Sequence, residues 1–184
     1  EFYAGGHSKG GNLAVYAAMN CKEETREKLL RVFNHDGPGF RPEIRQQGHY
    51  EEIKDRVVKF IPRSSLVGTI LEDQRDFEIL ESYGVGMLQH NAYSWKVEGN
   101  AIVRAQYMSQ GKLRRDAALN EWILSLTEEE THAFVDTLYE VVAASEASNV
   151  FQFGADWKKC LQHVLEPARE VDDDTKKAIM VIIR

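Results

Sequence analysis

The sequence predicts an α/β fold, with a parallel or mixed sheet flanked by helices and followed by a C-terminal helical segment. Two observations predict it. Over about the first 105 residues, short apolar runs bounded by turn formers alternate with stretches of helical periodicity. After about residue 110, apolar residues recur only with helical spacing. We therefore expect a domain over residues 1–108 and a helical tail over residues 109–184 that packs on it or forms a cap.

Each predicted strand is a short apolar or alternating run that ends at turn-forming residues. EFYAG begins the chain, RVFNH is followed by the turn formers of DGPGF, and DRVVKFIP ends at Pro62. The alternating run DFEILES predicts a further strand, and SWKVEGNAIVRAQ predicts a hairpin that turns at Glu98-Gly99-Asn100. The strands outside the hairpin are expected at residues 1–5, 31–35, 56–61 and 76–82.

Helices are predicted between these strands and throughout the tail. KGGNLAVYAAM is rich in alanine, the strongest helix former. Thr127 followed by Glu130 is a capping-box pattern, which predicts that a helix begins there, and apolar residues between 134 and 142 form its buried stripe. The other helical segments are expected at residues 9–19, 22–30 and 42–54, with a helical turn within 66–72.

Composition excludes several classes of function. With 43% hydrophobic and 28% charged residues, the chain has an ordinary globular composition. The net charge is −6 and the Lys and Arg residues are scattered, which argues against nucleic acid as the partner. No apolar run approaches the roughly 18 residues of a transmembrane segment. No cluster of His, Asp and Glu has metal-ligand spacing, so we expect neither a metal nor another cofactor.

The two cysteines and the start of the sequence bear on where the protein works. Cys21 and Cys160 are far apart in helical contexts, so we expect reduced structural thiols and a cytoplasmic chain. The sequence begins without an initiator Met, and Glu1 falls almost directly on the first strand. We therefore expect a piece of a longer protein, in which case the absence of a signal peptide carries little weight.

The segment GHSKG, residues 6–10, matches the pattern G-x-S-x-G between a predicted strand and a predicted helix. In a nucleophile elbow, the serine occupies a strained turn, and neighbouring glycines let the two backbones cross closely. Gly6, Gly10 and Gly11 would supply that room. The helix start would direct its N–H groups toward Ser8, and the N–H of Lys9 would be one oxyanion donor. The same pattern also fits a small polar residue in a tight turn.

Four motifs together resemble a known group of proteins. GHSKGGNLA resembles the elbow of α/β-hydrolase lipases and esterases. With NHDGPGF, IPRSSLVG and QHNAYSW following in order, residues 1–105 resemble a bacterial lipase-like family described as a domain of unknown function. The resemblance implies that residues 1–108 form the C-terminal part of an α/β-hydrolase-like domain. It also implies a serine hydrolase that cleaves a carboxylic ester or thioester of a small molecule or lipid through a Ser-His-Asp triad.

The general base must come from the six histidines of the chain. His7 is adjacent to Ser8, but in an elbow its side chain points away from the hydroxyl, which favours packing. His35 is expected to point to the opposite side of its strand end. His90, in QHNAYSW, matches the family's histidine position and is the expected base, with a structural role as the alternative. The remaining histidines lie in a polar segment or on tail helices: His49, His132 and His163.

Asp36 is the candidate acid, because it follows the strand after the elbow helix, where some lipases carry the acid of their triad. Its turn, DGPGF, also favours aspartate for a local reason, since an Asx-turn satisfies backbone N–H groups without any catalysis. Both interpretations stay open. Many other lipases carry the acid one strand later, where this chain reads Arg63-Ser64-Ser65, and that departure favours Asp36. A second departure is Asn91, which stands where the family is expected to carry aspartate.

The second oxyanion donor normally comes from a loop before the elbow strand, and we expect this chain to begin after it. Losing one donor costs about 3 kcal/mol of transition-state stabilisation, so we expect a weak or inactive enzyme here and a competent one in a longer chain. The alternative function is a catalytically weak or inactive binding or scaffold protein that uses the helical tail. Acyl transfer to an acceptor other than water would use the same residues. The Lys9 side chain either attracts an anionic substrate group or is simply solvated.

Overall fold

The computed structural model of the chain describes residues 1–72, 77–108 and 110–132. The chain divides into two compact units, Glu1–Asn120 and Glu121–Arg184, and the elements that carry the candidate site belong to the first. The boundary expected between residues 108 and 109 stays a prediction. The apolar stripe at 134–142, Cys160 and His163 lie outside the described residues.

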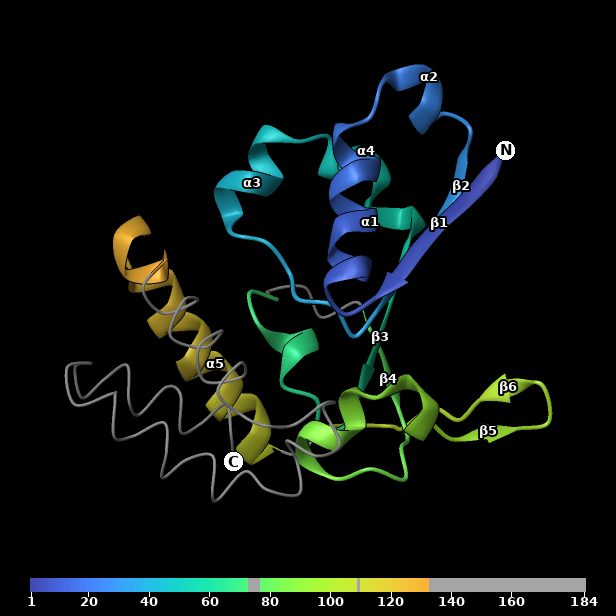
Figure 1. The fold of residues 1–184 in the computed structure, drawn as a ribbon, viewed down its shortest axis with the longest axis vertical. Helices are drawn as coiled ribbons and strands as arrows, with labels where there is room; N and C mark the ends of the chain where they lie inside the picture. Colours follow the sequence, from blue (N-terminus) through green and yellow to red (C-terminus); the bar gives the residue numbers. More distant parts are fainter. Residues whose placement is uncertain (73–76, 109, 133–184) are drawn as a thin grey trace, which may run out of the picture. The chain divides into compact units, whose positions relative to one another are not determined.

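The central sheet contains β1 (Phe2–His7), β2 (Leu29–His35), β3 (Val57–Pro62) and β4 (Glu78–Leu80). All neighbouring strands pair in parallel, in the order β1-β2-β3-β4 (Figure 1). This confirms the predicted α/β class with a parallel sheet. His7 pairs with His35, and His35 pairs with Phe60 of β3. The residues that follow β1 and β2 therefore meet at the same edge of the sheet, formed by the carboxyl ends of the strands.

Helix α1 (Lys9–Asn20) contacts both β1 and β2 and covers one face of the sheet (Figure 1). Its apolar face turns inward, which shields β2 and the segment after it from water. The buried residues of this core come from α1, β2 and the short helix α4 (Tyr50–Ile53): Val15, Ala18, Met19, Leu29, Val32, Tyr50 and Ile53.

Two predicted helices are shorter than expected. The helix predicted over residues 22–30 is only α2 (Glu23–Arg26), because β2 already begins at Leu29 to pair with Phe2. The helix predicted over residues 42–54 is divided into α3 (Pro42–Gln47) and α4, followed by the 3₁₀ turn η1 (Lys54–Arg56). The division lies at Gly48, where a Cβ would stand 3.1 Å from Met19 Sδ. The chain bends there, and Tyr50 and Ile53 reach the core beside Met19.

A hairpin follows the sheet, and pairing with its arms ends β4 early. Its strands are β5 (Val97–Glu98) and β6 (Ala101–Ile102), and Gly99, with φ 62°, begins the two-residue turn between them. The strand predicted over 76–82 is only Glu78–Leu80, because Glu81 pairs instead with the hairpin arms. Its N–H donates to Val103 O, and its carbonyl accepts from Lys96 N.

Helix α5 (Gln110–Ser125) follows the hairpin, and the capping box predicted after it is confirmed. Thr127 N donates to Glu130 Oε2 at 2.7 Å, and Glu130 N donates to Thr127 Oγ1 at 3.2 Å. These reciprocal bonds satisfy N–H groups that the first turn of a helix leaves without partners. Across the described ranges, no helix combines the length and the apolar character that crossing a membrane requires.

Candidate active site

Ser8 occupies a sharp turn between β1 and α1. Its backbone has φ 58° and ψ −130°, a conformation that a residue with a side chain rarely adopts. Ser8 N continues the sheet by donating to His35 O at 2.9 Å, whereas Ser8 O accepts from Gly11 N at 3.0 Å and so begins the helix. Lys9 is the first residue of α1, where helix geometry leaves the N–H without an intrahelical acceptor. The local geometry is therefore that of a strained strand–turn–helix.

The glycines around this turn have different roles. A Cβ on Gly6 would lie 2.5 Å from the carbonyl carbon of Gly10, and a Cβ on Gly11 would lie 2.4 Å from Asn34 Oδ1. Both positions therefore require glycine. The expectation for Gly10 was wrong in one respect, since a Cβ there would meet nothing within 4 Å. Gly10 matters because its backbone passes too close to Gly6 for a side chain to fit on Gly6.

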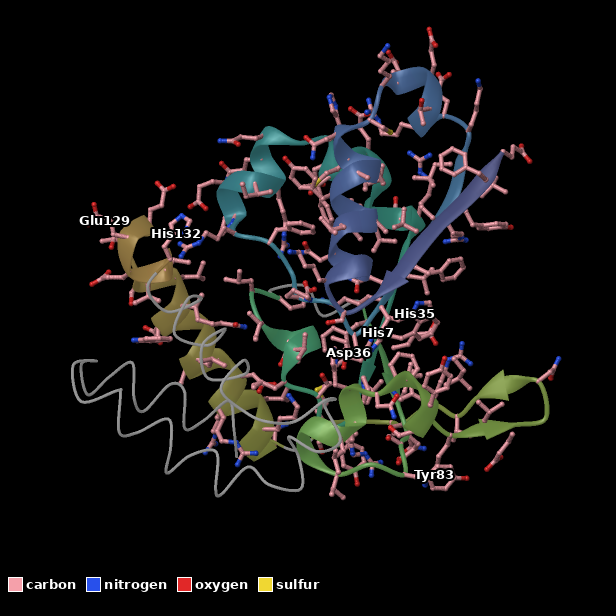
Figure 2. All side chains as sticks on the ribbon, in the orientation of Figure 1. His7, His35, Asp36, Tyr83, Glu129 and His132 are labelled. Carbon is pink, nitrogen blue, oxygen red and sulfur yellow. The ribbon has the colours of Figure 1, made fainter. Side chains whose placement is uncertain are left out.

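Asp36 lies at the carboxyl end of β2 and is fully buried, with 0% of its surface exposed. Figure 2 shows it beside His7 and His35, where β1 and β2 end. Asp36 Oδ2 accepts two hydrogen bonds, from Ser65 Oγ at 2.7 Å and from His90 Nδ1 at 2.8 Å. Its other oxygen, Oδ1, has no hydrogen-bond partner within the described ranges and faces Gly68, where a Cβ would stand 2.2 Å away.

The local interpretation of Asp36 as an Asx-turn residue loses its main support. The turn after β2 is closed by Asn34, whose Oδ1 accepts from Gly37 N at 2.8 Å. The carboxylate of Asp36 instead accepts from two side chains far away in the sequence. Asp36 itself has φ 54°, a left-handed conformation that aspartate tolerates better than most residues. The buried carboxylate therefore serves long-range contacts.

His90 ends the 3₁₀ helix η3 (Gly86–His90), and its side chain is 15% exposed. The preceding residue, Gln89, anchors this turn through three bonds. Its carbonyl accepts from Trp95 Nε1 at 2.9 Å, its Nε2 donates to Gly84 O at 2.9 Å, and its Oε1 accepts from Ser64 N at 2.8 Å. The histidine is thus presented to Asp36 from a loop that side-chain hydrogen bonds hold in place.

Asn91, the departure from the resembled pattern, has a local role. Its Oδ1 accepts from Tyr93 N at 3.1 Å and caps the short helix η4 (Ala92–Ser94). An aspartate oxygen would make the same bond, because carboxylate and amide oxygens both serve as caps. The substitution therefore leaves the His90 loop its cap.

The structure brings two of the three predicted catalytic side chains into direct contact. His90 and Asp36 are hydrogen-bonded, and Ser8 stands at the same edge of the sheet, next to the paired residues His7 and His35. Among the hydrogen bonds of the described chain, none joins the Ser8 hydroxyl to His90. Catalytic hydrogen bonds of this kind are often loose without substrate and tighten in the substrate complex.

His35 and His49, two other described histidines, have structural partners. His35 stacks on Phe60, with ring centroids 5.5 Å apart and an interplanar angle of 18°, and also packs against Trp95. Burial lowers the pKa of His35 below its ordinary value, a hydrogen bond with the backbone of Gly6 offsets this only in part, and nearby His7 lowers it further. His49 bonds Glu52 on the surface, and His132 is exposed.

Replacing His35 with Phe should reduce the acid sensitivity of the fold. Because the folded state lowers the pKa of His35, stability is complete above the ordinary value and falls as pH drops through it toward the folded value. Phe retains the stacking on Phe60 and carries no charge. Urea unfolding at about pH 8 and about pH 5 should show a smaller acid-induced loss for His35→Phe than for the parent. An equal loss in both proteins would contradict this assignment.

Sequence reasoning missed residues that support the site. Ser65 is 1% exposed and donates to Asp36, yet the sequence showed only that a serine stands where an acid was expected. Trp95 is part of the motif QHNAYSW, but nothing in the motif indicated that its indole N–H donates to the backbone of Gln89, the residue before His90. The signal available was position, since both residues lie within motifs that carried the resemblance.

In the described ranges, no three His, Cys, Asp or Glu side chains are grouped as metal ligands would be.

Comparison with known proteins places the chain in a family. No curated protein and no solved structure matches the chain. A family model described as Mbeg1-like matches residues 1–140, which include β1 through β6 and every candidate site residue. The chain therefore belongs to the Mbeg1-like family.

Proposed function

We propose that this protein is a serine hydrolase of the lipase and esterase type, which cleaves a carboxylic ester or thioester through Ser8, His90 and Asp36. The observation that carries the proposal is the hydrogen bond from His90 Nδ1 to the buried carboxylate of Asp36, at the sheet edge where Ser8 occupies its strained turn. A serine, an imidazole and a buried acid are the groups that acyl transfer requires.

The sheet supports an α/β-hydrolase-like arrangement as part of the same proposal. Ser8 directly follows β1, Asp36 directly follows β2, and His90 lies in η3, in the loop after β4, so the three residues come from segments that follow three of the four strands of one parallel sheet. In open α/β sheets, ligands bind at this edge. A substrate that is an ester of a small molecule or lipid, and a cytoplasmic location, are also parts of the proposal.

The proton transfers of the proposed reaction assign one role to each side chain. The Nδ1–H group of neutral His90 donates a hydrogen bond to Asp36 and keeps its proton. Nε2 is then the basic nitrogen. Ser8 Oγ attacks the carbonyl carbon while its proton passes to Nε2, and the N–H of Lys9 donates to the oxygen that becomes negative. The bond to the leaving group then breaks, and His90 returns the proton to the departing oxygen or sulfur. Water repeats the sequence on the acyl-enzyme and restores Ser8.

Asp36 makes this cycle favourable by charge. The imidazolium that forms on His90 pairs with a carboxylate from which water is excluded, where electrostatic attraction is stronger than at the surface. Ser65 keeps the carboxylate oriented toward His90. Transfer of the acyl group to an acceptor other than water would use the same steps and differ only in the second nucleophile.

A fluorophosphonate probe tests the proposal directly, because it reacts covalently with activated serines. We expect peptide mapping to place the label on Ser8, and we expect Ser8→Ala to abolish labelling and His90→Ala to suppress it. Ser64→Ala is a matched control, since Ser64 is exposed and bonds Gln89 through its backbone N–H, which alanine retains. Absence of labelling would favour a binding or scaffold protein instead, and labelling that persists in Ser8→Ala would contradict Ser8 as the nucleophile.

A further inference from the structure

His7 links the turn that carries Ser8 to the loop that carries His90. It is the last residue of β1 and directly precedes Ser8. Its Nε2 lies 2.6 Å from the backbone oxygen of His90, a residue 83 positions later in the chain. The two imidazole rings also pack against each other, with centroids 4.6 Å apart and an interplanar angle of 36°.

The chemistry of this contact defines which ring nitrogen of His7 is the donor. A carbonyl oxygen only accepts hydrogen bonds, so Nε2 of His7 must carry the proton that it donates. Nδ1 of a neutral His7 is then the bare nitrogen. The interaction is therefore a hydrogen bond from the elbow to the main chain of His90, and it leaves the imidazole of His90 available to Asp36.

The loop around His90 needs such a restraint. Its 3₁₀ helix is five residues long and lies outside the sheet, so the parallel ladder does not position it. Trp95, Gly84 and Ser64 hold Gln89, the residue before His90. The bond from His7 acts one residue further on, on the backbone of His90 itself. It is also the bond that comes from the residue covalently joined to Ser8.

We propose that His7 is a positioning residue, which holds the backbone of His90 in register with Ser8 so that Nε2 of His90 faces the serine hydroxyl. This inference rests on the proposed hydrolase function. A displacement of about 1 Å between a nucleophile and its base can lower a rate about 100-fold. His7 thus acts through His90 and contacts neither the substrate nor the reacting proton.

Two substitutions separate donation from packing. His7→Phe retains an aromatic ring against His90 and removes the donor. His7→Gln removes the ring and retains an N–H donor, because the Gln amide nitrogen is as many bonds from Cα as Nε2 of histidine. We expect His7→Phe to lower kcat for a p-nitrophenyl ester about tenfold or more with little change in KM. We expect His7→Gln to restore most of that loss.

A measurement that does not depend on turnover completes the test. The proton that His90 shares with Asp36 should give a far-downfield resonance in the proton NMR spectrum, absent in His90→Ala. We expect His7→Phe to broaden or abolish this resonance and His7→Gln to retain it. His49→Phe is the control, because the imidazole of His49 is exposed and bonds Glu52, away from the site. It should leave both readouts unchanged.

The outcomes distinguish this inference from the function on which it rests. Turnover and labelling that survive Ser8→Ala would overturn the hydrolase and, with it, the role of His7. Turnover that requires Ser8 but is unchanged in His7→Phe would overturn only the positioning role. Equal losses in His7→Phe and His7→Gln would show that the ring, not the donor, matters, and would also overturn it. An unchanged downfield resonance in His7→Phe would do the same.

Discussion

Replacing Asp36 with Asn should lower kcat for ester hydrolysis about 10⁴-fold while the chain still folds. Asn has nearly the shape of Asp, so it fits the buried site beside Gly68. If its oxygen takes the place of Oδ2, the bonds from Ser65 and His90 survive, but the negative charge that stabilises the imidazolium in the proposed mechanism is lost. If its NH₂ takes that place, it donates to Nδ1 of His90, and the histidine proton moves to Nε2. A protonated Nε2 cannot accept the proton of Ser8.

The experiment compares Asp36→Asn with Asp55→Asn. Asp55 is exposed on η1, so its replacement removes the same charge from the chain without touching the site. Steady-state kinetics should show the loss for Asp36→Asn alone, and thermal unfolding should show that both variants are folded. A kcat within tenfold of the parent for Asp36→Asn would contradict Asp36 as the triad acid.

The second large effect concerns neighbouring glycines in the first turn of α1. Gly11→Ala should destabilise the fold by about 1–3 kcal/mol, because its Cβ would stand 2.4 Å from Asn34 Oδ1 and 2.7 Å from Gly6 O. Gly10→Ala should be neutral or stabilising by up to about 1 kcal/mol, since its Cβ has open space and alanine favours the helix. The two substitutions are chemically identical and differ only in what surrounds them.

Gly11→Ala should also weaken the site, because Asn34 connects the two turns that form it. Asn34 Oδ1 accepts from Gly37 N and lies against the positions of both Gly11 and Gly37. Pushing Asn34 away therefore disturbs the turn that presents Asp36. Urea denaturation should show a lower midpoint for Gly11→Ala than for Gly10→Ala, and fluorophosphonate labelling should be slower. Equal midpoints for the two variants would contradict the close approach of the backbones.

Sequence reasoning was most successful where the determinants are local. The strand before Ser8, the helix after it, and the capping box at Thr127 each depend on a few adjacent residues. It was less successful for residues 42–54, where packing against Met19 bends the chain at Gly48. It also could not choose between an Asx-turn and a catalytic role for Asp36, because both roles favour aspartate in that turn.

By itself, the sequence determined the class of the fold, the strand–turn–helix around Ser8 and the short set of residues that chemistry allows as its partners. These follow from backbone sterics, helix propensity and apolar periodicity, which act between near neighbours. Only the tertiary structure decided that His90 reaches Asp36, that Ser65 holds the carboxylate and that His7 holds the His90 backbone. Those contacts join residues 54, 29 and 83 positions apart. The parallel pairing of neighbouring strands in the sheet from β1 to β4, together with the closure of the loops, brings these residues into contact. Local preferences carry no information on such distances, because the contacts form only when the whole sheet buries its core.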